Sequence, residues 1–445
     1  MENLDFNYSQ EQLKNIANQV LEKAYILGAT NAQVEINEGI DTSVDILNYN
    51  IENFSTSYDV SLILTVYIGN QRGSVGISKI SLDNIDEFIN KALDIAKYTQ
   101  PDLANGLPEI DLLCKSFTEN LNLYNPIKLD NKYLIEKASA IEAFALTQDA
   151  RLSSDGVSIG ISKYNFILAN THGLSLGYKT TRFDESISLI GKNTYGMQTD
   201  SWYTSNRNFN HLLPDEQLAN IAVSRVIRRL KPGKIKSGNY PVIFENSIAK
   251  SLIGNFLGAI SGNNLYRKLS FLNNSIDTKI FPDWLKITDD PFITNGLASC
   301  YFDNEGVNVH KRNLVEDGVV QGYLLSSYSA RKLKMLSTGN AGGNHNIIVK
   351  HNFSGDTLSL AKEMHNGLII IETIGHGVNM VNGDYSVGAS GLWVENGEIQ
   401  FFVENITISG NLKSIYKNIR YINNDIYNGS ILCGAILVNH INVSV

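Results

Sequence analysis

The segment "LSLGYKTTRFDESISLIG", residues 174–191, alternates apolar and polar side chains over much of its length. A period of two places successive side chains on opposite faces of an extended chain, so the segment predicts a β-strand. Two segments of the same kind precede it, "GVSIGIS" at 156–162 and "YNFILAN" at 164–170, beside the turn sequences "SSDG" and "NTHG". Alternating segments separated by turns are typical of an antiparallel sheet.

A helix precedes these strands, and the same order of elements occurs earlier in the chain. Apolar residues recur at helical spacing from Asn131 to Leu146 and, before the alternating segments 32–36, 42–47 and 60–69, from Gln10 to Leu27. The repeated order of one helix and several antiparallel strands predicts an internal duplication of an α+β unit.

Two further helices and two breaks complete the first half. Helical spacing covers Leu82–Tyr98 and Pro214–Leu230, and the second of these starts with proline and two acidic residues, a good N-terminal signature. The polar stretch Gln100–Lys128 is the best candidate for an internal linker. The sequence "KPGKIKSG" after residue 230 indicates a domain boundary, which predicts an N-terminal α+β domain at 1–230 and a C-terminal domain at 231–445.

The second half is richer in glycine, asparagine and short β-like runs than in long helices. Turn sequences such as "EDG" and "ENGE" lie between apolar runs, which is typical of hairpins. We expect a β-rich, barrel-like C-terminal domain with a few helices such as Thr357–His365, built from the segments "YPVIFEN", "VEDGVVQGYLLS", "GLIIIETIGHG", "GLWVENGEIQFFVENITISG" and "AILVNHINVSV". The fold class predicted for the whole chain is therefore α+β.

Composition narrows the classes of function. The chain of 445 residues is 43% hydrophobic and 18% charged, and it contains no run of 18 apolar residues, so we expect no membrane span. The polar N-terminus does not look like a secretory signal, and three widely spaced cysteines suit a reducing cytoplasm. A net charge of −8 argues against nucleic acid as a partner, with a local basic patch at Arg225, Arg228, Arg229 and Lys231 as a possible exception.

No familiar catalytic motif stands out in the second half. None of the eight histidines forms a close-spaced pair on a predicted helix, so scattered structural histidines are favoured over a zinc site. The glycine-rich "STGNAGGNHN", residues 337–346, lacks the lysine of a phosphate-binding loop, and "GVSIG" at 156–160 lies in strand-like sequence. We interpret the first as a structural loop and the second as a chance match to a nucleophile elbow.

Residues 382–391, "NGDYSVGASG", allow two interpretations. They contain Asp384, Tyr385, Ser386 and Gly388 just before a predicted strand. The segment is either a plain β-turn or a loop that lines a substrate cleft.

The segment "SLIGNFLGAISGNNLYRKLSFL", residues 251–272, begins with helical spacing and carries no catalytic side chain. Gly254 and Gly258 interrupt one side of this helix, and we expect them to let another backbone approach closely. A broad apolar face explains its burial and consists of Ile248, Ala249, Leu252, Ile253, Phe256, Leu257 and Ile260.

This segment, together with "GLASCYFDNEGV", "SYSARKLKMLSTGNAGGNHN" and "GDYSVGASGLWVENGEIQFFVENITISGNL", resembles the TldD/PmbA metalloprotease family, and within it the PmbA/TldE type of subunit. The resemblance extends over essentially the whole chain. It implies an N-terminal α+β domain and a C-terminal β-rich domain, in agreement with the pattern of the residues.

The resemblance also implies two paired subunits, of which the TldD type carries H-E-x-x-x-H and a C-terminal cysteine as zinc ligands. Aligned through Arg267 and Lys268, these positions fall on Gly254, Asn255 and Ala259, and Cys433 matches the cysteine. Ligands five residues apart lie about 140° apart on a regular helix, so that motif needs a local distortion. For this chain we predict no catalytic residue and no metal or cofactor of its own.

The function that the resemblance implies is proteolysis of unfolded peptides by a cytoplasmic zinc metalloprotease. The zinc and the catalytic base are expected from a TldD-type partner in a heterodimer. The alternative is a stand-alone regulatory or binding protein, such as a modulator of DNA gyrase, without peptidase activity.

Overall fold

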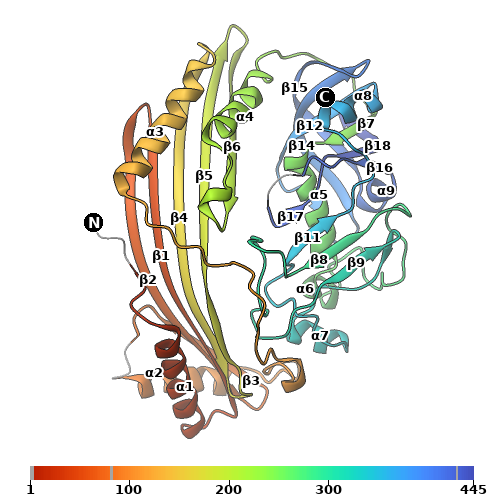
Figure 1. The fold of residues 1–445 in the computed structure, drawn as a ribbon. Helices are drawn as coiled ribbons and strands as arrows, with labels where there is room; N and C mark the ends of the chain where they lie inside the picture. The colour runs from red at the N-terminus through yellow and green to blue at the C-terminus, as the bar shows by residue number, and fades with distance from the viewer. Residues whose placement is uncertain (1–4, 81–83, 427–428) are drawn as a thin grey trace.

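The computed structural model describes residues 5–80, 84–426 and 429–445 (Figure 1). Its first half is built on an antiparallel sheet with the strand order β3-β2-β1-β4-β5-β6. Residues 175–193 form β5, so the alternation in the segment 174–191 does predict a strand. The strands are β1 (Asn31–Leu47), β2 (Asn50–Ile68), β3 (Gln71–Ile77), β4 (Leu152–Asn170), β5 (Ser175–Asn193) and β6 (Gly196–Asn206).

The predicted duplication is present in the order of the elements. The unit α1-β1-β2-β3-α2 is followed by the unit α3-β4-β5-β6-α4, and the antiparallel pair β1–β4 joins the two units at the centre of the sheet. The helices are α1 (Gln10–Ile26), α2 (Ile85–Tyr98), α3 (Asn131–Thr147) and α4 (Asp215–Ile227). Residues 82 and 83 of the second predicted helix lie outside the described residues.

Both pairs of helices cover the same face of the sheet, at opposite ends of its long strands. On β1, Val34 and Ile36 pack into the core with α1 and α2, whereas Val44 and Ile46 pack with α3 and α4. These four residues have even numbers and therefore point to one face. The odd-numbered residues of β1, among them Glu35, point to the other face, which is turned toward the second half of the chain (Figure 1).

The second half contains two sheets, one of which closes on itself. The strands β7, β12, β14, β15 and β18 pair in a ring, because β12 contacts both β7 and β14. This ring confirms the predicted barrel-like domain. Its sheet consists of β7 (Gly238–Phe244), β12 (Gly367–Ile374), β13 (Val378–Asn379), β14 (Asp384–Glu395), β15 (Glu398–Asn411), β16 (Ile419–Ile422) and β18 (Ile436–Ser444).

The other sheet is smaller and has the order β10-β9-β8-β11-β17. It consists of β8 (Ile287–Asp290), β9 (Arg312–Glu316), β10 (Val319–Val320), β11 (Asn346–Val349) and β17 (Ile431–Leu432). The helices of this half are α5 (Asn246–Ala259), α6 (Gly262–Tyr266), α7 (Ser327–Leu333), α8 (Thr357–Met364) and α9 (Leu412–Lys417). Within the described residues, no helix is both long and apolar enough to cross a lipid bilayer.

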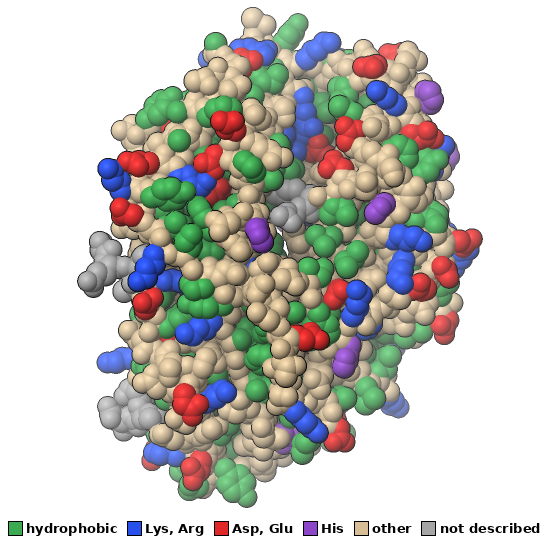
Figure 2. Space-filling view, viewed as in Figure 1, with side chains coloured by type: hydrophobic (Ala, Val, Ile, Leu, Met, Phe, Trp, Pro, Cys, Tyr) green, Lys and Arg blue, Asp and Glu red, His purple; other side chains and the backbone are tan. Residues whose placement is uncertain are grey.

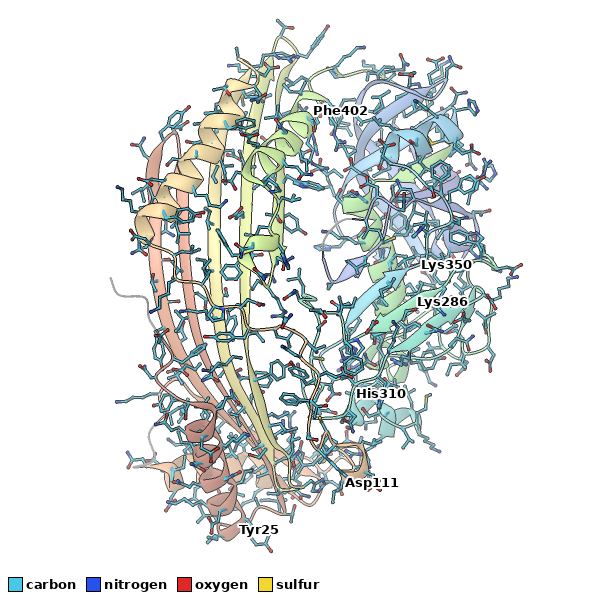
Figure 3. The ribbon with its side chains drawn as sticks, viewed as in Figure 1. Tyr25, Asp111, Lys286, His310, Lys350 and Phe402 are labelled. Carbon is cyan, nitrogen blue, oxygen red and sulfur yellow. The ribbon has the colours of Figure 1, made fainter. Side chains whose placement is uncertain are left out.

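The two halves touch at several places, two of which we call the upper and lower contacts after their positions in Figure 3. In the upper contact, the Arg229 guanidinium lies 5.5 Å from the ring centre of Phe402, which Figure 3 labels. In the lower contact, the chain around Asp111 runs close to the region of His310. Figure 2 shows that the molecular surface is hollowed between the two halves.

The lower contact is made by the stretch predicted as a linker. Residues 100–128 contain only a short 3-10 helix (Ile110–Leu112), yet they are tied to the second half. Arg331 on α7 donates to the carbonyl oxygens of Ala104 and Gly106, and Lys332 pairs with Asp102 at 2.8 Å. The linker is therefore a fixed strap. The predicted domain boundary after residue 230 falls between α4 and β7, and this division stays a prediction.

Acidic side chains form ion pairs with the arginines of the basic patch predicted near the end of α4. Arg225 and Arg229 each donate to Asp200, at 3.0 and 2.7 Å. Arg228 pairs with Glu245 at 2.6 Å, and Arg229 also pairs with Glu372 at 2.8 Å. These arginines hold the upper contact and do not form a free cationic surface for phosphate groups.

Candidate functional site: a glycine-lined cavity beside α5

The helix α5 follows β7 directly and is buried along its apolar face. Its fully buried residues include Leu252, Ile253 and Phe256, as the sequence predicts. The Tyr416 hydroxyl, itself buried, donates to the carbonyl oxygen of Leu252 at 3.0 Å. The helix is therefore a fixed wall of the second half of the molecule.

The expected role of the two glycines on α5 was wrong. A Cβ atom added to Gly254 would meet nothing within 4 Å, and one added to Gly258 would meet only the Met380 Cε atom, at 3.5 Å. Among the described residues, no backbone from another segment lies within 4 Å of either added Cβ atom. The sequence pattern cannot distinguish a glycine in a close contact from one beside open space, because both lack a side chain.

Gly254 and Gly258 border a cavity of about 470 Å³. Its other walls are the start of α6, the start of α7 and the glycine-rich loop before β11. The described residues that line it are uncharged: Gly254, Leu257, Gly258, Ser261, Gly262, Asn263, Leu324, Ser326, Ser329, Asn340, Gly342, Gly343, Asn344 and Ile431. Amide and hydroxyl groups can both donate and accept hydrogen bonds, so this lining suits a polar, uncharged group such as a peptide unit.

The end of α5 is fixed by side chains that bind its last carbonyl groups. Asn264 donates to the carbonyl oxygen of Gly258 at 2.8 Å, and Ser261 donates to the same oxygen at 2.9 Å. The hydroxyl of buried Ser270 donates to the carbonyl oxygen of Ala259 at 2.5 Å. These bonds satisfy carbonyls that a helix end leaves free, so the cavity has a rigid edge.

The loop 337–345 forms the opposite wall, and buried side chains anchor it. Asp289 accepts from the Asn340 amide at 3.0 Å and from the His345 backbone N–H at 2.8 Å. Arg312 donates to the Asn340 side-chain oxygen at 2.6 Å. Gly343 has a φ of +117°, in the region that favours glycine. The loop is a structural element, in agreement with its interpretation from the sequence.

A second cavity, of about 350 Å³, lies on the other side of this loop. It is bounded by the helix-free face of the long sheet and by residues 298–304 and 341–345. Gly342, Gly343 and Asn344 line both cavities. The two cavities are therefore neighbours that share the tip of one loop.

Asp303 holds the loop from the side of the second cavity. It is 4% exposed and accepts backbone N–H groups of Glu305, Val307 and Ala341, each at 2.9 Å. Burial raises its pKa to about 7, and the neighbouring Glu305 carboxylate adds to this increase. Burial likewise raises the pKa of the Cys300 thiol to about 12, so this cysteine is not an activated nucleophile.

The positions that the resemblance aligns with a zinc site are divided in this structure. Gly254 lines the first cavity and Asn255 is half-buried, whereas Ala259 and Cys433 are buried in the apolar core, at 0% and 1% exposure. Burial raises the pKa of the Cys433 thiol well above its usual range, and its sulfur lies 3.3 Å from the carbonyl oxygen of Gly434.

This donor set does not fit zinc. The groups available at the aligned positions are one amide and one buried thiol, and a structural or catalytic zinc site needs at least three nitrogen, sulfur or carboxylate ligands. Among the described residues, no group of three His, Cys, Asp or Glu side chains is arranged to hold a metal ion.

The segment 382–391 is mostly a strand, which neither sequence interpretation foresaw. Asp384 begins β14, and Tyr385 is 3% exposed in the core shared with α5. Asp384 and Ser386 are exposed, and Gly388 is half-buried. A short turn precedes Asp384, so the turn interpretation applies only to the start of the segment. None of these four residues lines the cavity beside α5.

Comparison with known protein families shows to which family the chain belongs. Three family models match it: PmbA/TldA metallopeptidase domain 1 at residues 32–96, the central domain at 124–230 and the C-terminal domain at 237–445. The chain belongs to the PmbA/TldD metallopeptidase family. Its relatives and its fold identify it as a member of the PmbA/TldE type, as the sequence resemblance predicts.

Among its relatives, the metalloprotease PmbA homolog of Haemophilus influenzae is 38% identical over 437 residues, which cover 98% of this chain and 96% of that protein. A crystal structure from Bacteroides thetaiotaomicron, described as a proposed modulator of DNA gyrase, has a TM-score of 0.92 at 24% identity and covers 98% of this chain and 99% of that one. TldE from Thermococcus kodakarensis has a TM-score of 0.86 at 20% identity, covering 97% and 100%. The two structures show that the fold is shared.

Local sequence patterns did not reveal most of the residues that form this candidate site. It singled out the loop 337–346 but not Asn263, Ser326 or Ser329, which reach the cavity from α6 and α7. It also gave no reason to place Glu35 on β1 beside the loop. The pairing of these segments depends on how the two halves pack, and local patterns carry no signal for such packing.

Proposed function

We propose that this PmbA/TldE-type chain is the non-catalytic subunit of a cytoplasmic zinc metalloprotease that degrades or processes unfolded peptides. A TldD-type partner supplies the zinc ion and the catalytic base in a heterodimer. The observation that carries the proposal lies on α5, where Gly254 in the wall of the first cavity and the neighbouring Asn255 occupy the positions that the family resemblance assigns to a zinc ligand and a catalytic base.

The residues of the first cavity support a role in holding a peptide. Asn263, Asn340 and Asn344 offer both N–H donors and C=O acceptors, and these match the two polar groups of a peptide unit. The absence of charge among the described lining residues means that the main chain of many sequences can be accommodated. The fixed C-terminal end of α5 and the anchored loop hold these groups in place before a ligand arrives, which lowers the cost of binding.

Reconstitution tests this proposal. The purified chain, a TldD-type partner and their equimolar mixture are each given a labelled unfolded peptide, and turnover is measured. We expect cleavage in the mixture and none with this chain alone. A second mixture uses a partner whose zinc-motif glutamate is replaced by glutamine, and it should be inactive. Residual turnover there would show that this chain has catalytic chemistry of its own.

A pair of variants connects the activity to the first cavity. Gly254→Leu should fill part of the cavity and lower turnover by the mixture at least about tenfold, because the side chain competes with the peptide for the same space. Gly254→Ala adds one methyl group in open space and should leave turnover within about twofold of the parent. Equal activity of both variants would show that the first cavity does not bind the peptide during turnover.

The alternative, a stand-alone regulator such as a modulator of DNA gyrase, has less support from the site. The arginines at the end of α4 are paired with Asp200, Glu245 and Glu372, and the described residues that line the first cavity carry no charge. Failure of the chain to bind any TldD-type subunit in the reconstitution would favour this alternative.

A further inference from the structure

The second cavity has walls from both halves of the molecule. The long sheet contributes Glu35 from β1, Phe166 from β4 and Tyr178 from β5. The second half contributes Phe302 and Asp303, which lie between β8 and β9. The register of the sheet places Phe166 opposite Tyr178, so their side chains stand together on the face that lacks helices.

The aromatic side chains form a fixed cluster at this cavity. The ring centres of Phe166 and Tyr178 are 4.6 Å apart at an interplanar angle of 75°, and those of Tyr178 and Phe302 are 5.6 Å apart at 77°. Edge-to-face contacts of this kind hold each ring in one orientation. Aromatic faces attract cations, most strongly where water is excluded.

Two carboxylates line the same cavity without a basic partner. Within the described residues, neither Glu35 nor Asp303 forms a salt bridge, and no Lys or Arg lines the cavity. Glu35 accepts only from the Asn37 amide, at 2.7 Å, and Asp303 accepts backbone N–H groups. Glu35 is half-buried beside a cavity whose described lining contains no lysine or arginine, whereas three backbone N–H groups hold the buried carboxyl group of Asp303.

Two basic residues near this cavity, Arg207 and His345, have hydrogen-bond partners of their own. Arg207 lies close to Tyr178 and Cys300, but its guanidinium donates to the carbonyl oxygens of Gly296 and Leu297, at 2.9 and 2.8 Å. The His345 Nδ1 atom is 3.1 Å from the Asp289 carboxylate, so any charge on this imidazole is balanced. Among the described residues that line the cavity, Glu35 is therefore an acidic side chain that has no charged partner.

We propose that the second cavity binds the cationic side chain of a lysine or arginine residue of the peptide. The carboxylates of Glu35 and Asp303 would receive the ammonium or guanidinium group, and the aromatic cluster would contact the aliphatic arm. This inference rests on the proposed function, because the peptide's main chain would lie in the adjoining first cavity across Gly342 and Gly343. The second cavity would give the site a preference for basic residues, whereas the first cavity would bind the main chain of any peptide.

Other side chains fit this cavity less well. An apolar side chain would displace water from the two carboxylates and give them no partner, which is costly for a charged group. An acidic side chain would meet the like charge of the Glu35 carboxylate at short range, which costs further free energy. A cation compensates the desolvation of Glu35 and Asp303, so discrimination should follow the charge of the ligand and not its size.

Binding of short peptides to the purified full-length chain tests the inference without any need for catalysis. The probes are acetylated, amidated pentapeptides of alanine with lysine, arginine, norleucine or glutamate at the central position, and dissociation constants are measured by calorimetry or NMR titration. We expect the lysine or arginine peptide to bind at least about tenfold more tightly than the norleucine peptide, and the glutamate peptide most weakly.

Three variants assign the preference to Glu35. Glu35→Gln should reduce the tenfold preference to about threefold or less, and Glu35→Lys should abolish it because the chain then supplies its own cation. Asp59→Asn is the matched control: Asp59 is an exposed carboxylate on the same sheet face, opposite Gly39, and it does not line the cavity. This control should keep the parental preference. Melting temperatures verify that all three variants are folded.

The outcomes separate this inference from the proposed function. Equal affinities for the lysine and norleucine peptides, binding of none of the peptides, or a preference that survives Glu35→Lys would each overturn the basic-residue site. Peptidase activity in the reconstituted mixture would still support the proposed function in those cases. Conversely, a clear charge preference in a chain that never activates a TldD-type partner would keep the binding site and reject the peptidase role.

Discussion

The Arg225 guanidinium donates a hydrogen bond to the Glu245 carboxylate at 2.7 Å, which joins α4 of the first half to the residue immediately before α5. Arg228 contacts the same carboxylate at 2.6 Å. Burial alone would raise the pKa of Glu245, but Arg228 and Arg225 outweigh it and lower this pKa to about 2. The position of the candidate site relative to the long sheet therefore depends on a buried ion cluster.

Removing Glu245 should destabilise the protein strongly. Glu245→Ala leaves two guanidinium groups with fewer acidic partners in a buried place, and breaking a buried pair in this way costs about 3–5 kcal/mol of unfolding free energy. Chemical denaturation measures this cost. The control is Glu363→Ala, which removes an exposed pair with Arg420 and should cost less than about 1 kcal/mol. Equal effects of the two variants would contradict a structural role for the cluster.

The contribution of Glu185 to the unfolding free energy should decrease as the pH rises from about 4.3 to about 7. Glu185 is 1% exposed, and burial raises its pKa to about 7 although Lys137 at 3.2 Å opposes the increase. The unfolded chain releases this proton near pH 4.3, so in that window the folded state binds more protons and loses stability with rising pH.

The variant Glu185→Gln isolates this effect. It cannot ionise, so its unfolding free energy should fall less steeply across the same pH window than that of the parent. Part of the slope should remain, because burial also raises the pKa of Asp303 to about 7. The exposed Glu136→Gln should leave the parental slope unchanged. A parental slope in Glu185→Gln would mean that Glu185 is ionised throughout the window.

The glycines around the first cavity should differ sharply in their tolerance of a methyl group. Gly254→Ala should leave the protein as stable as the parent or stabilise it by up to about 1 kcal/mol, because alanine favours a helix and its Cβ meets nothing within 4 Å. At Gly262 a Cβ would meet the Ser329 Oγ atom at 2.2 Å, so Gly262→Ala should destabilise by about 1–3 kcal/mol. Thermal or chemical denaturation measures both changes in unfolding free energy. A loss of stability in Gly254→Ala would show that the surroundings of Gly254 are not open.

The elements of this fold could be predicted where a local pattern determines them. Alternation marked β5, helical spacing marked α1 to α4, and their repeated order gave the duplicated unit. The apolar face of α5 correctly placed Leu252 and Phe256 in the core. Each of these features depends on residues that are close together in the sequence, and the spacing of their apolar side chains predicts which face is buried.

The candidate site could be predicted only in part, because it depends on contacts between distant segments. The alignment of family motifs led to α5, but the open space beside Gly254 depends on where α6, α7 and the loop 337–345 lie. The same holds for Asp384, whose segment reads as a turn until its pairing with β15 at Asn411 is known. Glycine and asparagine predict loops, and they are also the residues that line a polar cavity.

The zinc content of the purified chain tests the central claim most directly. The chain is dialysed against zinc-free buffer with and without prior zinc loading, and the bound metal is quantified by elemental analysis against protein concentration. Because the aligned positions offer only the Asn255 amide and the buried Cys433 thiol, we predict well below one zinc ion per chain in both preparations. One tightly held zinc ion per chain would contradict the account, since this subunit would then have a metal site of its own.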